Sequence, residues 1–236
     1  MQSMNLSPPE ERASRFRWWE LVLIFILNVS LYQLSGIGLF LEFGHLLSDT
    51  ISALLIAGLS VLFHFGFFWI FGILTHKISW KEVGADNFDF VGSGNGFWAI
   101  IITVIVFVGR MFLNVLLSEF FHQDSRKDPI DIITGGGIFW VGLLLFAGVI
   151  PIVEEFFFRG LLYRGLRQQL SPKVAIFFSA LLFGIAHLDW VQGILAGIMG
   201  IFLAWLYEKS GSLYIPILMH ILNNAITFLI AWYFLA

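Results

Sequence analysis

Two adjacent glutamates and an arginine interrupt an apolar stretch of the sequence, at Glu154, Glu155 and Arg159. Charged side chains are costly at membrane depth, so they usually face a protein interior or a cavity and mark function. On a helix, Glu155 and Arg159 lie four residues apart on one face, which suits an ion pair. Glu154 points about 100° away from Glu155 and needs a different partner. The alternative interpretation is that both acids only hold helices together.

Two further polar pairs with the same spacing lie downstream, Phe183 with His187 and His220 with Asn224. Residues four apart share one face of a helix. Taken alone, His187 could be a hydrogen-bonding group between helices, and Asn224 could serve helix packing. Together with the glutamate, the pairs supply one acid, two imidazoles and an amide on three helices, which is a combination that can hydrolyse an amide bond.

Amide hydrolysis needs a base, a donor for the developing oxyanion and a proton for the leaving amine. A carboxylate in an apolar cavity holds protons more strongly than in water and becomes a competent base, and a neighbouring histidine can help to hold the water. A second histidine and an amide can donate to the oxyanion, a stabilisation often worth ~3–4 kcal/mol per donor. Alternatively, Glu154, His187 and His220 could hold a zinc ion that keeps one position open.

Apolar helices must position these groups. The chain has 236 residues, of which 58% are hydrophobic and 12% charged, about half the charged fraction of a soluble domain. We therefore expect an all-α membrane protein, a polytopic bundle of about seven or eight transmembrane helices that encloses a polar cavity and is surrounded by membrane lipids. The net charge of −3 and the lack of a basic patch argue against nucleic acid as a partner. The absence of cysteine excludes disulfides and thiolate catalysis.

We expect one transmembrane domain over residues 1–236, with a polar N-terminal segment at 1–15 and a catalytic core at 136–224. Each long apolar run exceeds or approaches the ~20 residues that cross a bilayer. The expected spans are 18–41, 47–74, 97–121, a fourth from 136 to about 169, 173–188, 191–207, and a seventh from about 216 to the C-terminus.

The distribution of lysine and arginine predicts the orientation. With a cytoplasmic N-terminus, the outer side holds only Arg126 and Lys127. The inner side then holds ten basic residues: Arg12, Arg15, Arg17, Lys77, Lys81, Arg159, Arg164, Arg167, Lys173 and Lys209. This bias predicts an integral protein of the plasma (inner) membrane whose N-terminus is cytoplasmic.

The three polar motifs resemble those of the CPBP intramembrane protease family, which includes type II CAAX prenyl endopeptidases and bacterial abortive-infection and bacteriocin-immunity proteins. The shared patterns are Glu-Glu-x-x-x-Arg from Glu154 to Arg159, Phe-x-x-x-His at Phe183 and His187, and His-x-x-x-Asn at His220 and Asn224. Each pattern is weak alone, but all three in this order on apolar helices are specific. The resemblance covers about 136–224, and the first three spans match only in kind.

The resemblance implies a helical bundle whose conical cavity opens toward the cytoplasm, and an endopeptidase that cleaves a membrane-tethered, CAAX-type or prenylated substrate. Glu154 is similar to the family's water-activating glutamate, with His187 as its partner, and His220 and Asn224 resemble the oxyanion pair. Glu155 and Arg159 look like structural support, as does Phe183. This interpretation requires no cofactor, although many members are named metalloproteases, and zinc on Glu154, His187 and His220 is the alternative.

Two other functions compete with the protease. One is a non-enzymatic immunity or scaffold protein that retains the site, and the other is a proton-coupled transporter that uses Glu154, Glu155 and Arg110. Internal repeats would support a transporter, and none is evident. Arg110 and Asn114 share one face of the third span, and His64 lies in the second. These residues could line the same cavity, but we favour hydrogen bonding between helices for all three.

Overall fold

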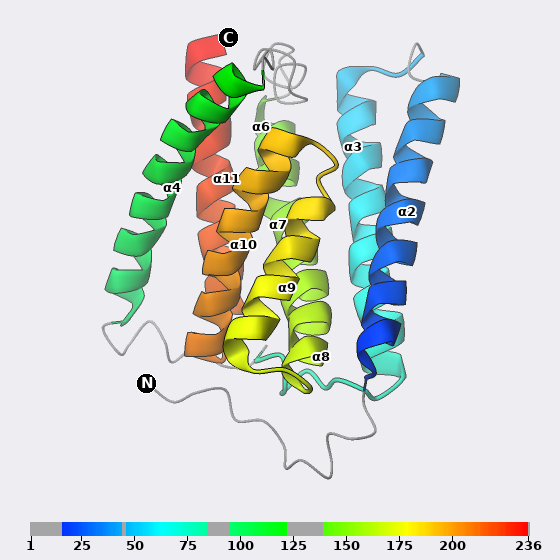
Figure 1. Cartoon of the computed structure of the whole chain (residues 1–236). Helices are drawn as coiled ribbons and strands as arrows, with labels where there is room; N and C mark the ends of the chain where they lie inside the picture. The colour runs from blue at the N-terminus through cyan, green and yellow to red at the C-terminus, as the bar shows by residue number, and fades with distance from the viewer. Residues whose placement is uncertain (1–15, 44–45, 85–94, 122–138, 236) are drawn as a thin grey trace.

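The computed structural model describes residues 16–43, 46–84, 95–121 and 139–235 as a bundle of helices, shown in Figure 1. Within these ranges six helices are long and apolar enough to cross a membrane, and a shorter apolar helix joins them. The predicted all-helical polytopic architecture is therefore confirmed. The predicted N-terminal segment 1–15, the predicted outer residues Arg126 and Lys127, and residues 136–138 of the predicted core lie outside the described residues.

The first three spans flank the bundle on two sides. The helix α2 (Trp18–Phe43) is the first, and α4 (Asn95–Phe120) is the third. The second is made by α3 (Asp49–Ser60) and two π-helical stretches, η1 (Val61–Phe65) and η2 (Phe68–Leu74). Figure 1 shows α2 and α3 at one side and α4 at the other, with the remaining helices between them.

The remaining helices carry all three polar motifs. The fourth span is a continuous run of α6 (Phe139–Gly142), η5 (Leu143–Val149), α7 (Ile150–Glu155), η6 (Phe156–Tyr163) and α8 (Arg164–Arg167). It is followed by α9 (Pro172–Ile185), α10 (Trp190–Ser210) and α11 (Tyr214–Leu235). The helix of the fourth span changes to π-helical hydrogen bonding on both sides of α7, a feature frequent at functional sites.

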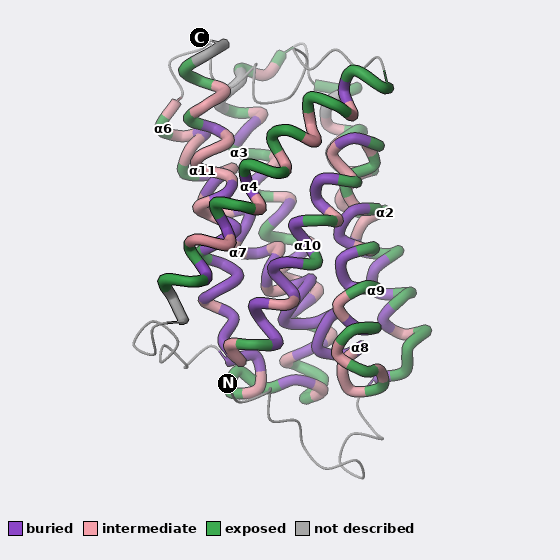
Figure 2. Tube along the Cα trace, turned by 60° about the vertical axis from the view of Figure 1, so that its left-hand side comes forward, coloured by how far each residue is buried: buried purple, intermediate pink, exposed green. Residues whose placement is uncertain are grey.

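Burial separates the central helices from those at the edge. Figure 2 shows buried residues concentrated on the inner helices. Many large apolar side chains of α2 and α4 are exposed. Phe157, Leu161 and Leu162 in η6 are completely buried, whereas Ile105 and Phe112 in α4 are 64% and 68% exposed. An exposed apolar face of this extent suits contact with lipid rather than water.

The helices α9 and α10 pack with almost no side chain between them. A Cβ atom added to Gly184 would lie 2.6 Å from the carbonyl oxygen of Gly193, and one added to Gly200 would lie 3.0 Å from Cα of Ala180. Small residues allow such close approach of helices in membranes. The glycines on the facing sides of α9 and α10 therefore permit this close packing.

The fifth span ends earlier than the sequence suggested. We expected a helix over 173–188, but α9 ends at Ile185, and His187 lies in the following turn, where Leu188 has a left-handed φ of 55°. The turn is anchored from two sides: Gln33 Nε2 donates to the carbonyl of Ala186 at 3.1 Å, and the Asp189 carboxylate accepts from the Gln192 amide at 2.8 Å. The prediction was too long because apolar sequence continues through a turn that tertiary contacts impose.

The turn between α10 and α11 lies deeper in the bundle than the turn before α9. Tyr163 Oη donates to Glu208 at 2.7 Å, and Arg167 pairs with the same carboxylate at 3.2 Å. The end of α10 is therefore level with Tyr163 to Arg167, the last turn of the fourth span. This offset explains how His220, only six residues into α11, reaches the level of Glu155.

Candidate active site

A buried cluster built on Glu155 joins three helices. Arg159 Nη1 donates to Glu155 Oε1 at 2.6 Å, and both side chains are completely buried. Arg159 Nη2 also donates to the carbonyl of Gly200 at 3.2 Å, and its guanidinium lies 4.6 Å from the centre of the Phe183 ring. The ion pair predicted from the four-residue spacing is confirmed, and its arginine ties the fourth span to α9 and α10.

The imidazole of His220 lies between the two glutamates. Its Nδ1 is 2.8 Å from Glu155 Oε1, and since a carboxylate only accepts, Nδ1–H donates. The other nitrogen, Nε2, faces Glu154 Oε2 at 3.8 Å. This separation is too long for a direct hydrogen bond, and a water beside the two atoms could contact both.

His187 is held by the end of α9. Its Nδ1–H donates to the carbonyl of Phe183 at 2.9 Å, which leaves Nε2 directed away from the helix end. The Phe183 ring contacts both imidazoles edge-on, with centroid distances of 5.0 Å to His187 and 5.7 Å to His220. The Phe183 ring therefore helps to position both histidines. Within the described part of the chain, His220 is the histidine that lies within 4 Å of the Glu154 carboxylate.

Asn224 belongs to a chain of hydrogen bonds that begins at Arg110. Arg110 Nη1 donates to Asn223 Oδ1 at 2.7 Å, and Asn223 Nδ2 donates to Asn224 Oδ1 at 2.9 Å. Asn224 Nδ2 in turn donates to the carbonyl of Phe146 at 3.2 Å. Sequence reasoning missed Asn223, although two consecutive asparagines within a predicted span are a signal for hydrogen bonding between helices.

The predicted catalytic residues meet at one cavity of about 370 Å³. Its walls come from α4, the fourth span, the end of α9, α10 and α11. The polar side chains that line it are Arg110, Asn114, Glu154, His187, Gln192, His220, Asn223, Asn224 and Thr227. Glu155 and Arg159 lie behind this wall. Arg110 and Asn114 line the cavity, which is the alternative to hydrogen bonding between helices, and Arg110 also makes such a bond to Asn223 of α11. His64 is buried outside the cavity and contacts Ser60 of its own span.

The cavity lies in the half of the bundle remote from the N-terminal end of α2. The amide of Trp18 donates to Gln169 Oε1 at 3.1 Å, which places the start of α9 beside the start of α2. His187 follows the opposite end of α9, as Figure 1 shows for the turn between α9 and α10. A cytoplasmic N-terminus and a cavity open to the cytoplasm, both expected from the sequence, are therefore difficult to combine.

The residues do not form a ready metal site. Both imidazoles have Nδ1 held by protein acceptors, which is the orientation that metal ligands take. However, within the described ranges no three His, Asp or Glu side chains are grouped closely enough to hold one ion. The set of Glu154, His187 and His220 thus fits zinc in its chemistry and not in its present spacing.

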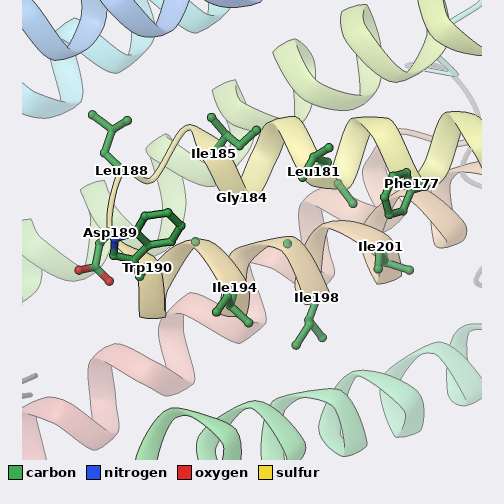
Figure 3. Close-up of a pocket in the computed structure, with 13 residues that line it drawn as sticks. Phe177, Leu181, Gly184, Ile185, Leu188, Asp189, Trp190, Ile194, Ile198 and Ile201 are labelled. Carbon is green, nitrogen blue, oxygen red and sulfur yellow. The ribbon is translucent and has the colours of Figure 1, made fainter. Parts of the chain in front are cut away.

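A second hollow has no comparable chemistry. Figure 3 shows an apolar groove of about 530 Å³ between the outward sides of α9 and α10. Large apolar side chains form its walls: Phe177, Leu181 and Ile185 on α9, and Ile194, Ile198 and Ile201 on α10. Its titratable group, Asp189, caps α10. Neither His187 nor His220 lines this groove, whereas both line the polar cavity, which is therefore the candidate active site.

Comparison with known proteins supports the family suggested by the motifs. Residues 136–226 match the family described as type II CAAX prenyl endopeptidase Rce1-like, which confirms the resemblance over these residues. A Bacillus subtilis protein named "Putative membrane peptidase YdiL" is 32% identical over 74 residues, which are 31% of this chain and 30% of that protein. The UPF0177 protein YajF of Lactococcus lactis is 34% identical over 100 residues, or 39% of this chain and 48% of that protein.

The matched segments span about a third and about half of these two relatives. No solved structure matches the chain. The spanning helices and the membrane peptidase relative agree on an integral membrane protein.

Proposed function

We propose that this protein is an intramembrane endopeptidase that hydrolyses a peptide bond of a membrane-tethered substrate. The observation that carries the proposal is the placement of Glu154, His187, His220 and Asn224 on one cavity, with His220 fixed toward Glu154 by the buried Glu155. The match to the type II CAAX prenyl endopeptidase family supports a CAAX-type substrate, in which a prenyl group would provide the tether.

Glu154 is the proposed general base. Its side chain is 17% exposed and lines the cavity, whereas Glu155 is completely buried and already paired. A water held between Glu154 and the imidazoles would lose a proton to the carboxylate while its oxygen attacks the scissile carbonyl. His187, whose Nδ1 is occupied by the Phe183 carbonyl, offers Nε2 to hold this water.

Asn224 and His220 would serve the tetrahedral intermediate. One N–H of the Asn224 amide is used by Phe146, and the other is available for the oxyanion. Because His220 donates Nδ1–H to Glu155, its Nε2 can donate only after it has received a proton. Glu154 faces that nitrogen, so the proton taken from water can pass to His220 and on to the oxyanion or to the leaving amine as the C–N bond breaks.

The test is turnover of a fluorogenic, prenylated CAAX-type peptide by the purified full-length chain in detergent or nanodiscs. Glu154→Gln is expected to lower kcat by about 10²–10⁴-fold, the range of general acid–base catalysis, without loss of folding. Glu119→Gln is the matched control, because Glu119 is an exposed carboxylate near the end of α4. Turnover by Glu154→Gln at the wild-type rate would refute the assigned base, and an unprenylated peptide cleaved equally well would remove the prenyl requirement.

A further inference from the structure

Arg110 is a cation on the cavity wall with little to neutralise it. Its guanidinium makes one hydrogen bond, from Nη1 to the Asn223 amide oxygen at 2.7 Å. Its Nε is buried and has no partner. Within the described part of the chain no carboxylate pairs with Arg110.

The contrast with Arg159 shows how unusual this is. Arg159 is also within a membrane span, and it has a carboxylate at 2.6 Å, a carbonyl at 3.2 Å and an aromatic ring beneath it. Charged groups taken out of water are normally paired and hydrogen-bonded in this way. Among the described residues, the partner of Arg110 is one neutral amide oxygen, so the remaining N–H groups of its two Nη atoms are available to a ligand in the cavity.

The charges on the cavity wall are separated. Glu154 lies on the fourth span and Arg110 on α4, and the two line the same cavity without pairing. A planar guanidinium matches a carboxylate with two parallel hydrogen bonds. A peptide in the cavity could therefore present a carboxylate to Arg110 and an amide bond to Glu154.

We propose that Arg110 binds a carboxylate of the substrate, on the leaving side of the cleaved bond, and so determines substrate specificity. This inference rests on the proposed peptidase function. The cavity of about 370 Å³ holds only a short peptide segment, so the carboxylate that binds Arg110 must lie within a few residues of the cleaved bond. The free C-terminal carboxylate of a substrate that is cleaved near its C-terminus meets this condition. An acidic side chain in that fragment is the second source of the same group.

A purely structural role for Arg110 makes a different prediction. The chain from Arg110 through Asn223 to Asn224 could serve only to orient the Asn224 amide. Loss of the arginine would then slow every substrate by the same factor. Loss of a carboxylate-binding group changes the ratio between substrates that carry the carboxylate and those that lack it.

The experiment compares three tethered peptides that differ only beyond the cleaved bond: a C-terminal acid, a C-terminal amide, and an amide with an added glutamate. The enzymes are wild type, Arg110→Gln, Arg110→Lys and, as a control for the loss of one positive charge, Lys209→Gln, which is exposed at the end of α10. A charge-assisted hydrogen bond changes affinity by about ten- to a hundredfold, and we expect wild type and Lys209→Gln to prefer the acid by that ratio in kcat/KM. In Arg110→Gln the ratio falls to about one, and Arg110→Lys recovers part of it.

Binding of the same peptides to Glu154→Gln, with and without Arg110→Gln, is followed by fluorescence anisotropy. Preference for the glutamate-containing amide over the acid assigns the carboxylate to a side chain. Equal kcat/KM for all three peptides in wild type, or an equal loss on all three in Arg110→Gln, overturns the inference and leaves the peptidase proposal intact. If no peptide is cleaved but the acid still binds better through Arg110, the peptidase proposal fails while carboxylate binding stands; absence of both overturns both.

Discussion

Nδ1 of His220 lies 2.8 Å from the same oxygen of Glu155 that accepts the hydrogen bond of Arg159. One buried carboxylate therefore connects α11 to the fourth span, and Arg159 extends the connection to α10 through the carbonyl of Gly200. The neighbouring Glu154 has no such duty and faces the cavity. The two adjacent glutamates consequently have separable roles, one in holding the helices together and the other in the proposed chemistry.

Substitution of Glu155 is expected to cost far more stability than substitution of Glu154. Removing one partner of a buried ion pair leaves an uncompensated charge on Arg159 and costs about 3–5 kcal/mol, which would lower the apparent Tm by roughly 10 °C. We expect this loss for Glu155→Gln and a change below about 1 kcal/mol for Glu154→Gln, as for most partly exposed substitutions. Thermal unfolding in detergent, followed by intrinsic tryptophan fluorescence, measures both.

Glu20→Gln is the matched control for the loss of an ion pair. Glu20 pairs with Lys77 at 2.9 Å, with side chains 28% and 27% exposed, so its loss should cost at most about 1 kcal/mol. Equal Tm values for Glu155→Gln and Glu20→Gln would show that the buried cluster does not stabilise the bundle.

Gly184→Ala is expected to reduce activity by displacing the end of α9. The new Cβ would lie 2.6 Å from the Gly193 carbonyl oxygen, so one backbone must move, at a typical overpacking cost of about 1–3 kcal/mol. Phe183 and His187 lie directly beside this contact. Their movement should lower kcat by a larger factor than it changes KM. Gly58→Ala is the control, because its added Cβ meets nothing within 4 Å. Equal kinetics for the two variants would show that the close packing of α9 on α10 does not position His187.

Much of the fold follows from local properties that the sequence displays. Apolar runs longer than a bilayer crossing mark the spans, and the four-residue spacing of Glu155 and Arg159 predicts their pairing because both lie on the same helix. The close packing of α9 and α10 follows from the glycines on one face. These are properties of one helix or of two consecutive ones.

The site depends on relationships between distant helices, which local pattern does not determine. That His220 hydrogen-bonds to Glu155 and faces Glu154 with its other nitrogen follows from the rotation of α11 about its axis, set by packing. The turn before α11 lies inside the bundle and so brings His220 level with Glu155. Counting residues from the membrane edge does not predict this level, because the count assumes that every helix begins at that edge. Arg110 had no visible partner in the sequence, because Asn223 lies more than a hundred residues away.

Metal removal tests the choice between activated water and zinc. Because Glu154, His187 and His220 are not grouped as a ligand set within the described structure, we expect the active protein to contain far less than one zinc per chain and to retain its kcat after dialysis against a chelator. Elemental analysis of the detergent-purified protein and turnover before and after chelation provide the measurement. Stoichiometric zinc, with activity lost on chelation and restored by zinc, would instead show that the three side chains converge on a metal.

The orientation of the bundle decides from which side of the membrane the cavity is reached, and a chain without cysteine allows it to be measured with single-cysteine variants. Leu188 is 65% exposed in the turn after His187, and Lys209 is exposed at the other end of α10. Since α10 has the length of a membrane span, the two positions should react on opposite sides.

With a cytoplasmic N-terminus, a membrane-impermeant maleimide should label Leu188→Cys on intact cells and Lys209→Cys only after permeabilisation, and the cysteine-free wild type should remain unlabelled. That result would place the His187 side of the cavity toward the outer face, so substrates would enter from that face or laterally from the bilayer. The reverse labelling would contradict the orientation predicted from lysine and arginine and would place the cavity toward the cytoplasm.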